Sequence, residues 1–215
     1  MGEACGLLLP ALAFSAACSM FDPISFRSAL GSFATGVTIV TARDPGGRPV
    51  GLTANSFNSV SLDPPMVLWS LSLHSSSLPV FRDAASWAVH VLAADQKPLS
   101  DRFATPGVDK FVGLDLSDGP EGAPLIEGCA ARFGCRGQFE YEGGDHAIFL
   151  GEVIDFGRRE ADPLIYHGGQ YGRIMREQSG ADLEREGLAE REGGNLVLTE
   201  RGAELLEALK GIAGR

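Results

Sequence analysis

The stretch Gly51–Pro65 places hydroxyl and amide side chains where a buried strand would carry Val or Ile. Its sequence is GLTANSFNSVSLDPP, and its hydrogen-bonding residues are Thr53, Asn55, Ser56, Ser59 and Ser61. Such side chains, on a backbone that small residues leave accessible, suit a planar phosphorylated ligand. Serine, asparagine and aspartate are also ordinary turn formers. The stretch alone therefore leaves a ligand site and a serine-rich turn equally open.

Three consecutive serines form a second polar group. Ser75–Ser77 come directly before Leu78–Ala85, a segment expected to be helical. The unpaired N–H groups and the dipole at a helix N-terminus attract phosphate. Ser76 and Ser77 are therefore candidates for binding a phosphate group, and ordinary helix capping by one serine is the competing interpretation.

Imidazole and phenol groups gather further along the chain. His146 follows a Gly-Gly-Asp turn, so its imidazole is expected to project from the start of a strand. Tyr166, His167 and Tyr171 lie close together in the segment YHGGQY. Core packing is a nearly equal explanation for the two tyrosines, and a lone histidine is more often structural than catalytic.

Strands are the elements that must position these groups. Apolar and β-branched runs between Gly, Pro and Asp turns predict strands over Gly36–Ala42, Val50–Asn55, Ser59–Leu62, Met66–Leu73, Trp87–Leu92, Cys129–Glu142 and His146–Phe156. Short helices are expected over Asp22–Phe33, Leu78–Ala85 and Asp95–Phe103, with Asp22 and Asp95 as N-caps. Without regular strand–helix alternation, this order predicts a mainly β fold: an antiparallel β-barrel with short helices rather than a doubly wound sheet.

The composition is that of one globular domain with enough chain to bury a sizeable core. The 215 residues are 44% hydrophobic and 21% charged, and the net charge is −10. Nucleic acid is not an expected partner, because phosphate binding needs clustered Lys and Arg. The four cysteines lack the spacing of a metal site, and Cys129 and Cys135 are interpreted as reduced thiols.

The N-terminal segment differs from this domain. Residues 1–19 contain an apolar stretch that lacks the positive flank of a signal peptide and is too short to span a bilayer. We expect translation to start at Met20, which leaves 1–19 as an unstructured extension. The protein is then expected in the cytoplasm, without a membrane partner.

The C-terminal segment forms a second boundary. The main domain is expected over 20–175, and residues 176–215 are expected to form a short α-rich appendage. Its predicted elements are a helix over Gly180–Glu190, a strand-like run Asn195–Leu198 and a helix from Glu200 to Ile212 with Thr199 as its N-cap.

From Phe21 to about Ile174 the chain resembles the flavin reductase-like family, the small NAD(P)H-dependent reductases that supply reduced flavin to two-component monooxygenases. The resemblance depends on the joint order and spacing of several modest motifs. These are FATGVTIVTA (33–42), GLTANSFNSVSLDPPMVLWSLS (51–72), HSSSLPVF (74–81), WAVHVLAADQKPLSDRFA (87–104), DKF (109–111), GDHAIFLGEV (144–153) and LIYHGGQYGRI (164–174).

The resemblance implies an FMN-binding split barrel that works as a homodimer, with the flavin near the subunit interface. It implies that the ribityl chain and the ring are contacted by Thr53, Ala54, Asn55, Ser56, Ser59 and Val60. It implies phosphate binding by Ser76 and Ser77, and a nicotinamide contact by His146. Tyr166, His167 and Tyr171 would flank the flavin or the nicotinamide. FMN or FAD is the expected cofactor, NADH or NADPH the co-substrate, and an oxygenase component the expected protein partner.

Two other functions stay open at this point. One is an FMN-binding redox sensor that does not turn over rapidly and signals through its tail. The other is an FMN oxidase of the pyridoxamine-phosphate type, which needs a basic site for the substrate phosphate that the sequence does not display. A Rossmann domain is not supported, since no GxGxxG motif follows a strand.

The tail has a partial resemblance of its own. Residues 183–209 resemble the end of a winged-helix regulator of the multiple-antibiotic-resistance type. A complete DNA-binding domain does not fit in this length, and the acidic excess of the tail argues the same way. An effector-sensing or dimer-stabilising role and a plain amphipathic tail packing on the barrel are the open alternatives.

Overall fold

The computed structural model of the protein describes residues 21–175 and 180–213. The chain divides into two compact units between Ile174 and Met175, and each is described by itself. The expected extension 1–19 and the expected start at Met20 lie outside the described residues. Among the helices of the described ranges, none has the length and apolar character needed to cross a bilayer.

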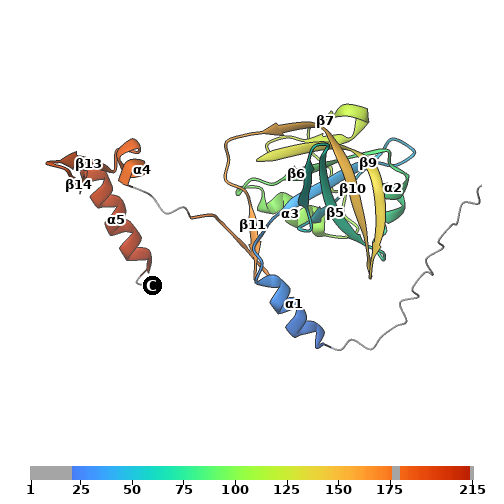
Figure 1. Ribbon diagram of the computed structural model, residues 1–215, viewed down its shortest axis with the longest axis horizontal. Coiled ribbons are helices and arrows are strands. Elements are labelled where there is room, and N and C mark those ends of the chain that lie inside the picture. Colours follow the sequence, from blue (N-terminus) through green and yellow to red (C-terminus); the bar gives the residue numbers. More distant parts are fainter. Residues whose placement is uncertain (1–20, 176–179, 214–215) are drawn as a thin grey trace, which may run out of the picture. The chain divides into compact units, whose positions relative to one another are not determined.

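One large antiparallel sheet dominates the first unit (Figure 1). Its strand order is β3-β2-β6-β9-β10-β5-β4. The strands are β2 (Thr38–Arg43), β3 (Pro49–Ala54), β4 (Asn58–Leu62), β5 (Pro65–Ser72), β6 (Ser86–Val91), β9 (Ala131–Gly143) and β10 (His146–Arg158). All seven match predicted strands to within a few residues, which confirms the mainly β, antiparallel interpretation.

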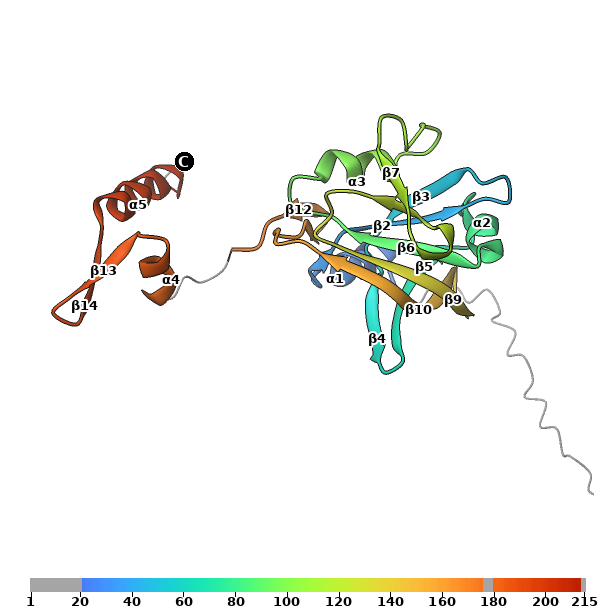
Figure 2. The same ribbon diagram turned by 90° about the horizontal axis from the view of Figure 1, so that it is seen from above.

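Two small sheets and three short helices surround this sheet (Figure 2). The small sheets are β1-β11-β12 and β7-β8, formed by β1 (Thr35–Gly36), β11 (Ile165–His167), β12 (Gln170–Gly172), β7 (Leu116–Asp118) and β8 (Pro124–Ile126). The helices are α1 (Pro23–Gly31), α2 (Leu78–Asp83) and α3 (Lys97–Ala104), and a 3-10 turn covers Pro120–Gly122. Apart from Gly36, which lies in the predicted strand Gly36–Ala42, the strands of the small sheets were not predicted from the sequence.

Strand β2 is buried on both faces, which explains its uninterrupted apolar and β-branched run. Val40 faces a core cluster centred on Trp69, Trp87 and Phe149. A second cluster, which includes Phe103 of α3, contains Val37 and Ile39. These residues occupy odd-numbered positions and Val40 an even-numbered one, so they lie on the opposite face of the strand. Because strand side chains alternate between faces, β2 separates the two clusters. The second cluster supports the pocket described below.

The end of the polar stretch is fastened to β5. The Ser56 hydroxyl donates to the backbone carbonyl of Ser70 at 3.0 Å and accepts from the backbone N–H of Ser70 at 2.9 Å. Because Asn58 pairs with Leu68, these two bonds continue the β4–β5 pairing beyond the end of β4 through a side chain. This role accounts for one polar residue of Gly51–Pro65 without any ligand.

The predicted helix caps have opposite outcomes. Asp22 caps α1 as predicted, because its carboxylate accepts from the Ser25 backbone N–H at 2.8 Å. Asp95 does not cap α3, so that prediction is wrong: the N-cap residue is Gln96, which makes no capping bond to the helix. The Gln96 side chain instead accepts from the backbone N–H of Ala93 at 2.9 Å and closes the turn before the helix.

Two cysteines of this unit are free thiols, as predicted. Cys135 lies on β9, whereas Cys129 precedes that strand. Burial raises the pKa of Cys135 to about 12 and that of Cys129 to about 11. Both thiols are therefore protonated and weakly nucleophilic at neutral pH.

The second unit contains α4 (Gly180–Arg185), β13 (Ala189–Glu192), β14 (Asn195–Leu198) and α5 (Glu200–Ala213). The predicted helix over Gly180–Glu190 is too long, because Gly187 adopts a positive φ of 67° and a strand follows it. The Thr199 cap is confirmed: its hydroxyl accepts from the Gly202 backbone N–H at 3.2 Å. The partial resemblance of this unit to the end of a winged-helix domain stays a prediction.

Candidate functional site

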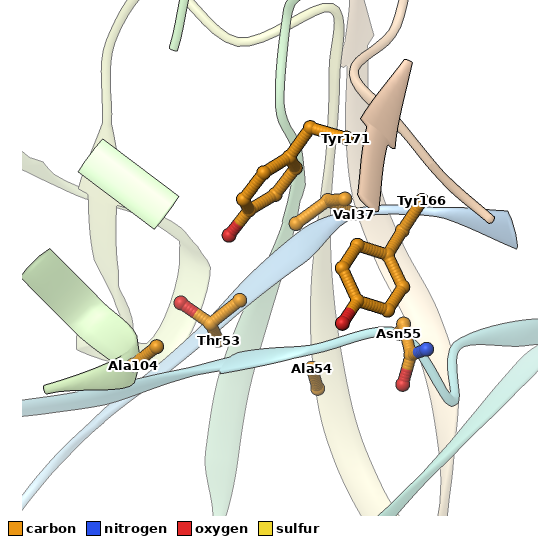
Figure 3. Close-up of a pocket in the computed structure, with 7 residues that line it drawn as sticks. All are labelled: Val37, Thr53, Ala54, Asn55, Ala104, Tyr166 and Tyr171. Atoms are coloured by element: carbon orange, nitrogen blue, oxygen red, sulfur yellow. The ribbon is translucent and has the colours of Figure 1, made fainter. Parts of the chain in front are cut away.

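A pocket of about 240 Å³ lies where β3 meets the small β1-β11-β12 sheet. Its lining residues are Val37, Thr53, Ala54, Asn55, Ala104, Tyr166 and Tyr171. Figure 3 shows both tyrosine rings with their hydroxyl ends directed towards the strand that carries Thr53 and Asn55. Five of these residues are predicted site residues, drawn from two segments more than a hundred positions apart in the sequence.

The two tyrosines form one wall of the pocket. Tyr166 on β11 pairs directly with Tyr171 on β12, so their side chains leave the same face of the small sheet. The rings meet edge to face, with centroids 5.4 Å apart and planes at 70°. Both rings also pack against the core cluster that contains Val37 and Phe103. The two tyrosines thus pack against the core and also line the pocket.

Strand β3 forms the opposite wall. The Thr53 hydroxyl donates to the backbone carbonyl of Ser100 in α3 at 2.7 Å. The carbonyl of Ala54 accepts from the Thr38 hydroxyl at 2.6 Å, which fixes this end of β3 to β2. Thr53 therefore offers a ligand its oxygen lone pairs, because its proton is already donated to α3. Asn55 is exposed, and its amide is available to both donate and accept.

Charged groups stand outside the pocket rather than in its lining. Lys97 of α3 holds its ammonium 4.8 Å from the centroid of the Tyr171 ring and donates to Asp101 at 2.6 Å. The hydrogen bond from Lys97 is the main cause that lowers the pKa of Asp101, and a hydrogen bond from Tyr171 lowers it further. All seven lining side chains are uncharged. Such a pocket suits the uncharged parts of a ring system and its polyol chain.

Two basic residues of the quoted motifs, Arg102 and Lys110, could supply positive charge to a phosphate, but both are bonded elsewhere. The Arg102 guanidinium donates to the backbone carbonyl of Val112 at 3.1 Å and lines a different cavity. Lys110 donates to the backbone carbonyl of Gly51 at 3.1 Å, and partial burial lowers its pKa. Neither side chain lines the tyrosine pocket.

The other predicted residues of the polar stretch do not line this pocket. Ser56 is bonded to Ser70, as described above. Ser59 and Val60 are exposed on β4 at the far edge of the large sheet. Their proposed contacts with flavin remain predictions.

Ser76 and Ser77 lie at the N-terminus of α2, outside the pocket lining. Ser77 occupies the N-cap position, but its hydroxyl makes no capping hydrogen bond. Within residues 21–175 and 180–213 the structure offers neither hydroxyl a hydrogen-bond partner. The hydroxyls are thus available to a ligand, although α2 has six residues and a correspondingly short run of aligned dipoles.

His146 is the first residue of β10, opposite Ser72 of β5. Its Nδ1 lies 2.7 Å from a carboxylate oxygen of Asp145, and its side chain is 43% exposed. The imidazole projects from a strand start as predicted, but it does not line the tyrosine pocket. His167 follows Tyr166 on β11 and is exposed. Their nicotinamide and flavin contacts stay predictions.

Three residues near the pocket escaped the sequence analysis. Val37 and Ala104 are apolar residues with no chemical signature, although both lie in the quoted motifs. Thr35 pairs directly with Tyr166, so its side chain leaves the face of the small sheet that carries the tyrosines. Its buried Oγ1 has no hydrogen-bond partner among the described residues. A buried hydroxyl without a partner is costly, and a ligand group would satisfy it.

The pocket fits part of a flavin. Two aromatic rings, small Ala54 and Ala104 side chains and the oxygens of Thr53 and Asn55 suit a planar ring with a polyol chain. Its volume is below the ~300–1,000 Å³ typical of small-molecule sites, so the pocket by itself suits only part of such a ligand.

Comparison with known proteins agrees with this geometry. A family model described as "Flavin reductase like domain" matches residues 30–175. The chain is 52% identical over 153 residues to an FMN reductase (NADH) of Agrobacterium fabrum, a match that covers 71% of this chain and 87% of that protein. It is 43% identical over 145 residues to the reductase component of a flavin-dependent trigonelline monooxygenase of Acinetobacter baylyi, covering 67% and 47% of the two chains.

Solved structures give the same result. The NADH:FAD oxidoreductase of Streptomyces globisporus, solved with NAD and FAD fragments, superposes with a TM-score of 0.69 at 40% identity, covering 74% of this chain and 96% of that one. The flavin reductase PheA2 superposes with a TM-score of 0.68 at 38% identity, covering 73% and 100%. These neighbours confirm the split-barrel fold. The family model spans most of the chain, so the chain belongs to the flavin reductase-like family.

Proposed function

We infer that the protein is an NADH-dependent flavin reductase that reduces FMN or FAD. The pocket between the two tyrosine rings and the polar end of β3 is the observation that carries this inference. The named relatives include an FMN reductase (NADH) and an NADH:FAD oxidoreductase. Both flavins therefore belong in the first assay, with NADH as the expected donor and NADPH as the alternative.

The protein contributes binding and orientation rather than acid–base chemistry. A bound flavin supplies the ring that accepts a hydride from the nicotinamide. For a bound flavin, Tyr166 and Tyr171 would provide apolar surface, and Thr53 and Asn55 would provide hydrogen-bonding groups. No proton has to be taken up by an ionised side chain in the pocket, which agrees with its uncharged lining.

We propose that the reduced flavin passes to a separate oxygenase component. Two relatives are named as reductase subunits or components of such systems, from Rhizobium meliloti at 41% identity and from Acinetobacter baylyi at 43%. The pocket's limited volume supports this proposal, because a partly enclosed flavin exchanges with solvent more readily than an enclosed one. The cytoplasmic location expected from the sequence remains a proposal as well.

We also propose that two copies of the chain form a homodimer. Helix α1 has no buried residue, and Ile24 on it is 80% exposed. Figure 2 shows β4 and its turn projecting from the sheet, and Leu62 at the end of β4 is 93% exposed. Helix α1 also exposes Phe26 and Leu30, and apolar side chains gathered on one exposed element mark an association surface. A second copy would also supply the surface that the pocket lacks.

Sedimentation velocity tests the dimer directly. A Leu62→Asp or Ile24→Asp variant should sediment as a smaller species than the wild-type protein and bind FMN more weakly. Val108→Asp, an exposed apolar residue in a loop, is the matched control. If the wild-type protein sediments as a monomer at micromolar concentration, the homodimer is excluded.

The enzyme assignment is tested by oxidation rates over a matrix of NADH and NADPH against FMN, FAD and riboflavin. Rapid NADH oxidation that depends on added flavin is expected. No oxidation with any combination would contradict the assignment. If flavin stays bound during dialysis and NADH is oxidised only slowly, the redox-sensing function would be favoured instead.

A further inference from the structure

Ser100 is a buried residue of α3 whose polar groups are bonded to both walls of the tyrosine pocket. Its relative exposure is 0%. Its hydroxyl lies 2.9 Å from the hydroxyl of Tyr171, and its backbone carbonyl accepts from the Thr53 hydroxyl at 2.7 Å. One helix residue thus holds a side chain from β12 and a side chain from β3.

The Ser100 and Tyr171 hydroxyls share one hydrogen bond, in which either oxygen can be the donor. Whichever oxygen donates, this bond ties the hydroxyl of Tyr171 to α3.

The ring of Tyr171 is fixed at the same time. The Lys97 ammonium lies 4.8 Å from its centroid, within the range of a cation–π contact. The Tyr166 ring meets it edge to face. Tyr171 therefore lines the pocket with a ring whose position is held in part by the hydrogen bond between its hydroxyl and Ser100.

We propose that Ser100 is a positioning residue for flavin binding: it acts through the Tyr171 hydroxyl to hold the ring that forms one wall of the flavin pocket. The proposal rests on the proposed function, because it takes the ligand of this pocket to be a flavin. Ser100 itself does not line the pocket. Its effect must reach the ligand through Tyr171 and, on the other wall, through Thr53.

A double-mutant cycle with steady-state kinetics tests this proposal. Ser100→Ala should raise the KM for flavin about 2- to 10-fold, the range that corresponds to one lost hydrogen bond. The KM for NADH should change less, because the substitution acts on the flavin wall alone. Tyr171→Phe keeps the ring and should raise the flavin KM by a similar factor. In the double variant the two effects should not multiply, since both remove the same hydrogen bond.

Ser86→Ala is the matched control. Ser86 is a buried serine whose hydroxyl donates to the Glu121 carbonyl at 2.9 Å and which does not line the pocket. Its loss should lower the melting temperature without raising the flavin KM. A merely structural role of Ser100 would give the same pattern for Ser100→Ala, and that outcome overturns the proposal.

The remaining outcomes are also decisive. Effects of Ser100→Ala and Tyr171→Phe that multiply fully in the double variant would show that Ser100 does not act through the phenol. If Ser100→Ala does not fold, Tyr171→Phe alone is the test. An unchanged KM for flavin in Tyr171→Phe would show that the Ser100–Tyr171 hydrogen bond has no effect on flavin binding. A wild-type protein that oxidises no NADH with any flavin would contradict the proposed function instead.

Discussion

A Cβ atom placed on Gly51 would lie 2.7 Å from Cε1 of Phe103, so the ring from α3 rests directly on the backbone of β3. Cζ of Phe111 lies 3.1 Å from the same position. The two rings meet edge to face with centroids 5.0 Å apart. This contact sets the distance between α3, which carries Ser100 and Ala104, and the strand that carries Thr53.

Gly51→Ala should therefore destabilise the protein and loosen the pocket. Inserting a methyl group into this packed contact is expected to cost about 1–3 kcal/mol of unfolding free energy. Urea unfolding measures the loss, and the KM for flavin should rise in parallel because α3 shifts. Gly36→Ala is the control, since a Cβ there meets nothing within 4 Å. A Gly51→Ala protein as stable as the control would contradict the packing argument.

Because His90 is buried, we expect the protein to lose stability in mild acid. Its ring is fully buried, with Nδ1 at 3.1 Å from the Ile39 carbonyl and Nε2 accepting from the Ile126 backbone N–H at 3.1 Å. Burial is the main cause that lowers the pKa of His90 to about 4. The unfolded chain takes up a proton below pH ~6.5, whereas the folded chain does so only near its lower pKa. Stability is therefore complete above pH ~6.5 and falls as the pH drops towards 4.

The size of this effect is about 3 kcal/mol, from the difference between the two pKa values. Unfolding free energies measured by urea from pH 7 to pH 4.5 check it. His90→Asn removes the titration and should flatten the part of the curve between pH 6.5 and 4.5. An identical pH dependence in the variant and the wild type would exclude His90 as its source.

His146→Ala should weaken the use of NADH more than the binding of flavin. The imidazole is half-exposed beside Asp145 and outside the tyrosine pocket, so a contact with the second substrate would leave flavin binding intact. Loss of a hydrogen bond to a charged or polar substrate group corresponds to roughly a tenfold rise in the KM for NADH. Steady-state kinetics and flavin fluorescence titration separate the two effects. His74→Ala, an exposed histidine, is the matched control, and equal losses of both functions would refute the role.

Replacing Ser76 and Ser77 together with Ala should weaken FMN far more than riboflavin. Only FMN carries a phosphate, and a hydrogen bond to a charged group is worth about 1.5–3 kcal/mol, which is about tenfold or more in affinity. Fluorescence titration with both flavins measures the ratio. The same change for FMN and riboflavin would remove the phosphate assignment. Because both hydroxyls lack partners among the described residues, the unfolding free energy should hardly change.

Local patterns predicted the strands and most helix limits. The alternation in Trp87–Leu92 and the turn before His146 are properties of neighbouring residues, and they gave β6 and the β9–β10 hairpin. Asp22 was a correct cap because an aspartate before a proline forms its bond within one turn. Asp95 was a wrong cap because Gln96, one residue later, closes the preceding turn. The helix over Gly180–Glu190 was too long, since Gly187 turns the chain.

In the tyrosine pocket, the residue types come from the sequence and their arrangement comes from the tertiary structure. The sequence determined which residues have ligand chemistry: Thr53 and Asn55 by their hydrogen-bonding groups, Tyr166 and Tyr171 by their rings, and the family by the order of its motifs. Tertiary structure alone decided that the segment with Thr53 meets the segment with Tyr171. It also decided that the side chains of Ser56 and Lys110 hydrogen-bond to the backbone of Ser70 and Gly51. It also decided that Ser100 joins the two walls. Such roles depend on which atoms lie within 3 Å of each other, and contacts between distant segments leave no period or spacing in the chain.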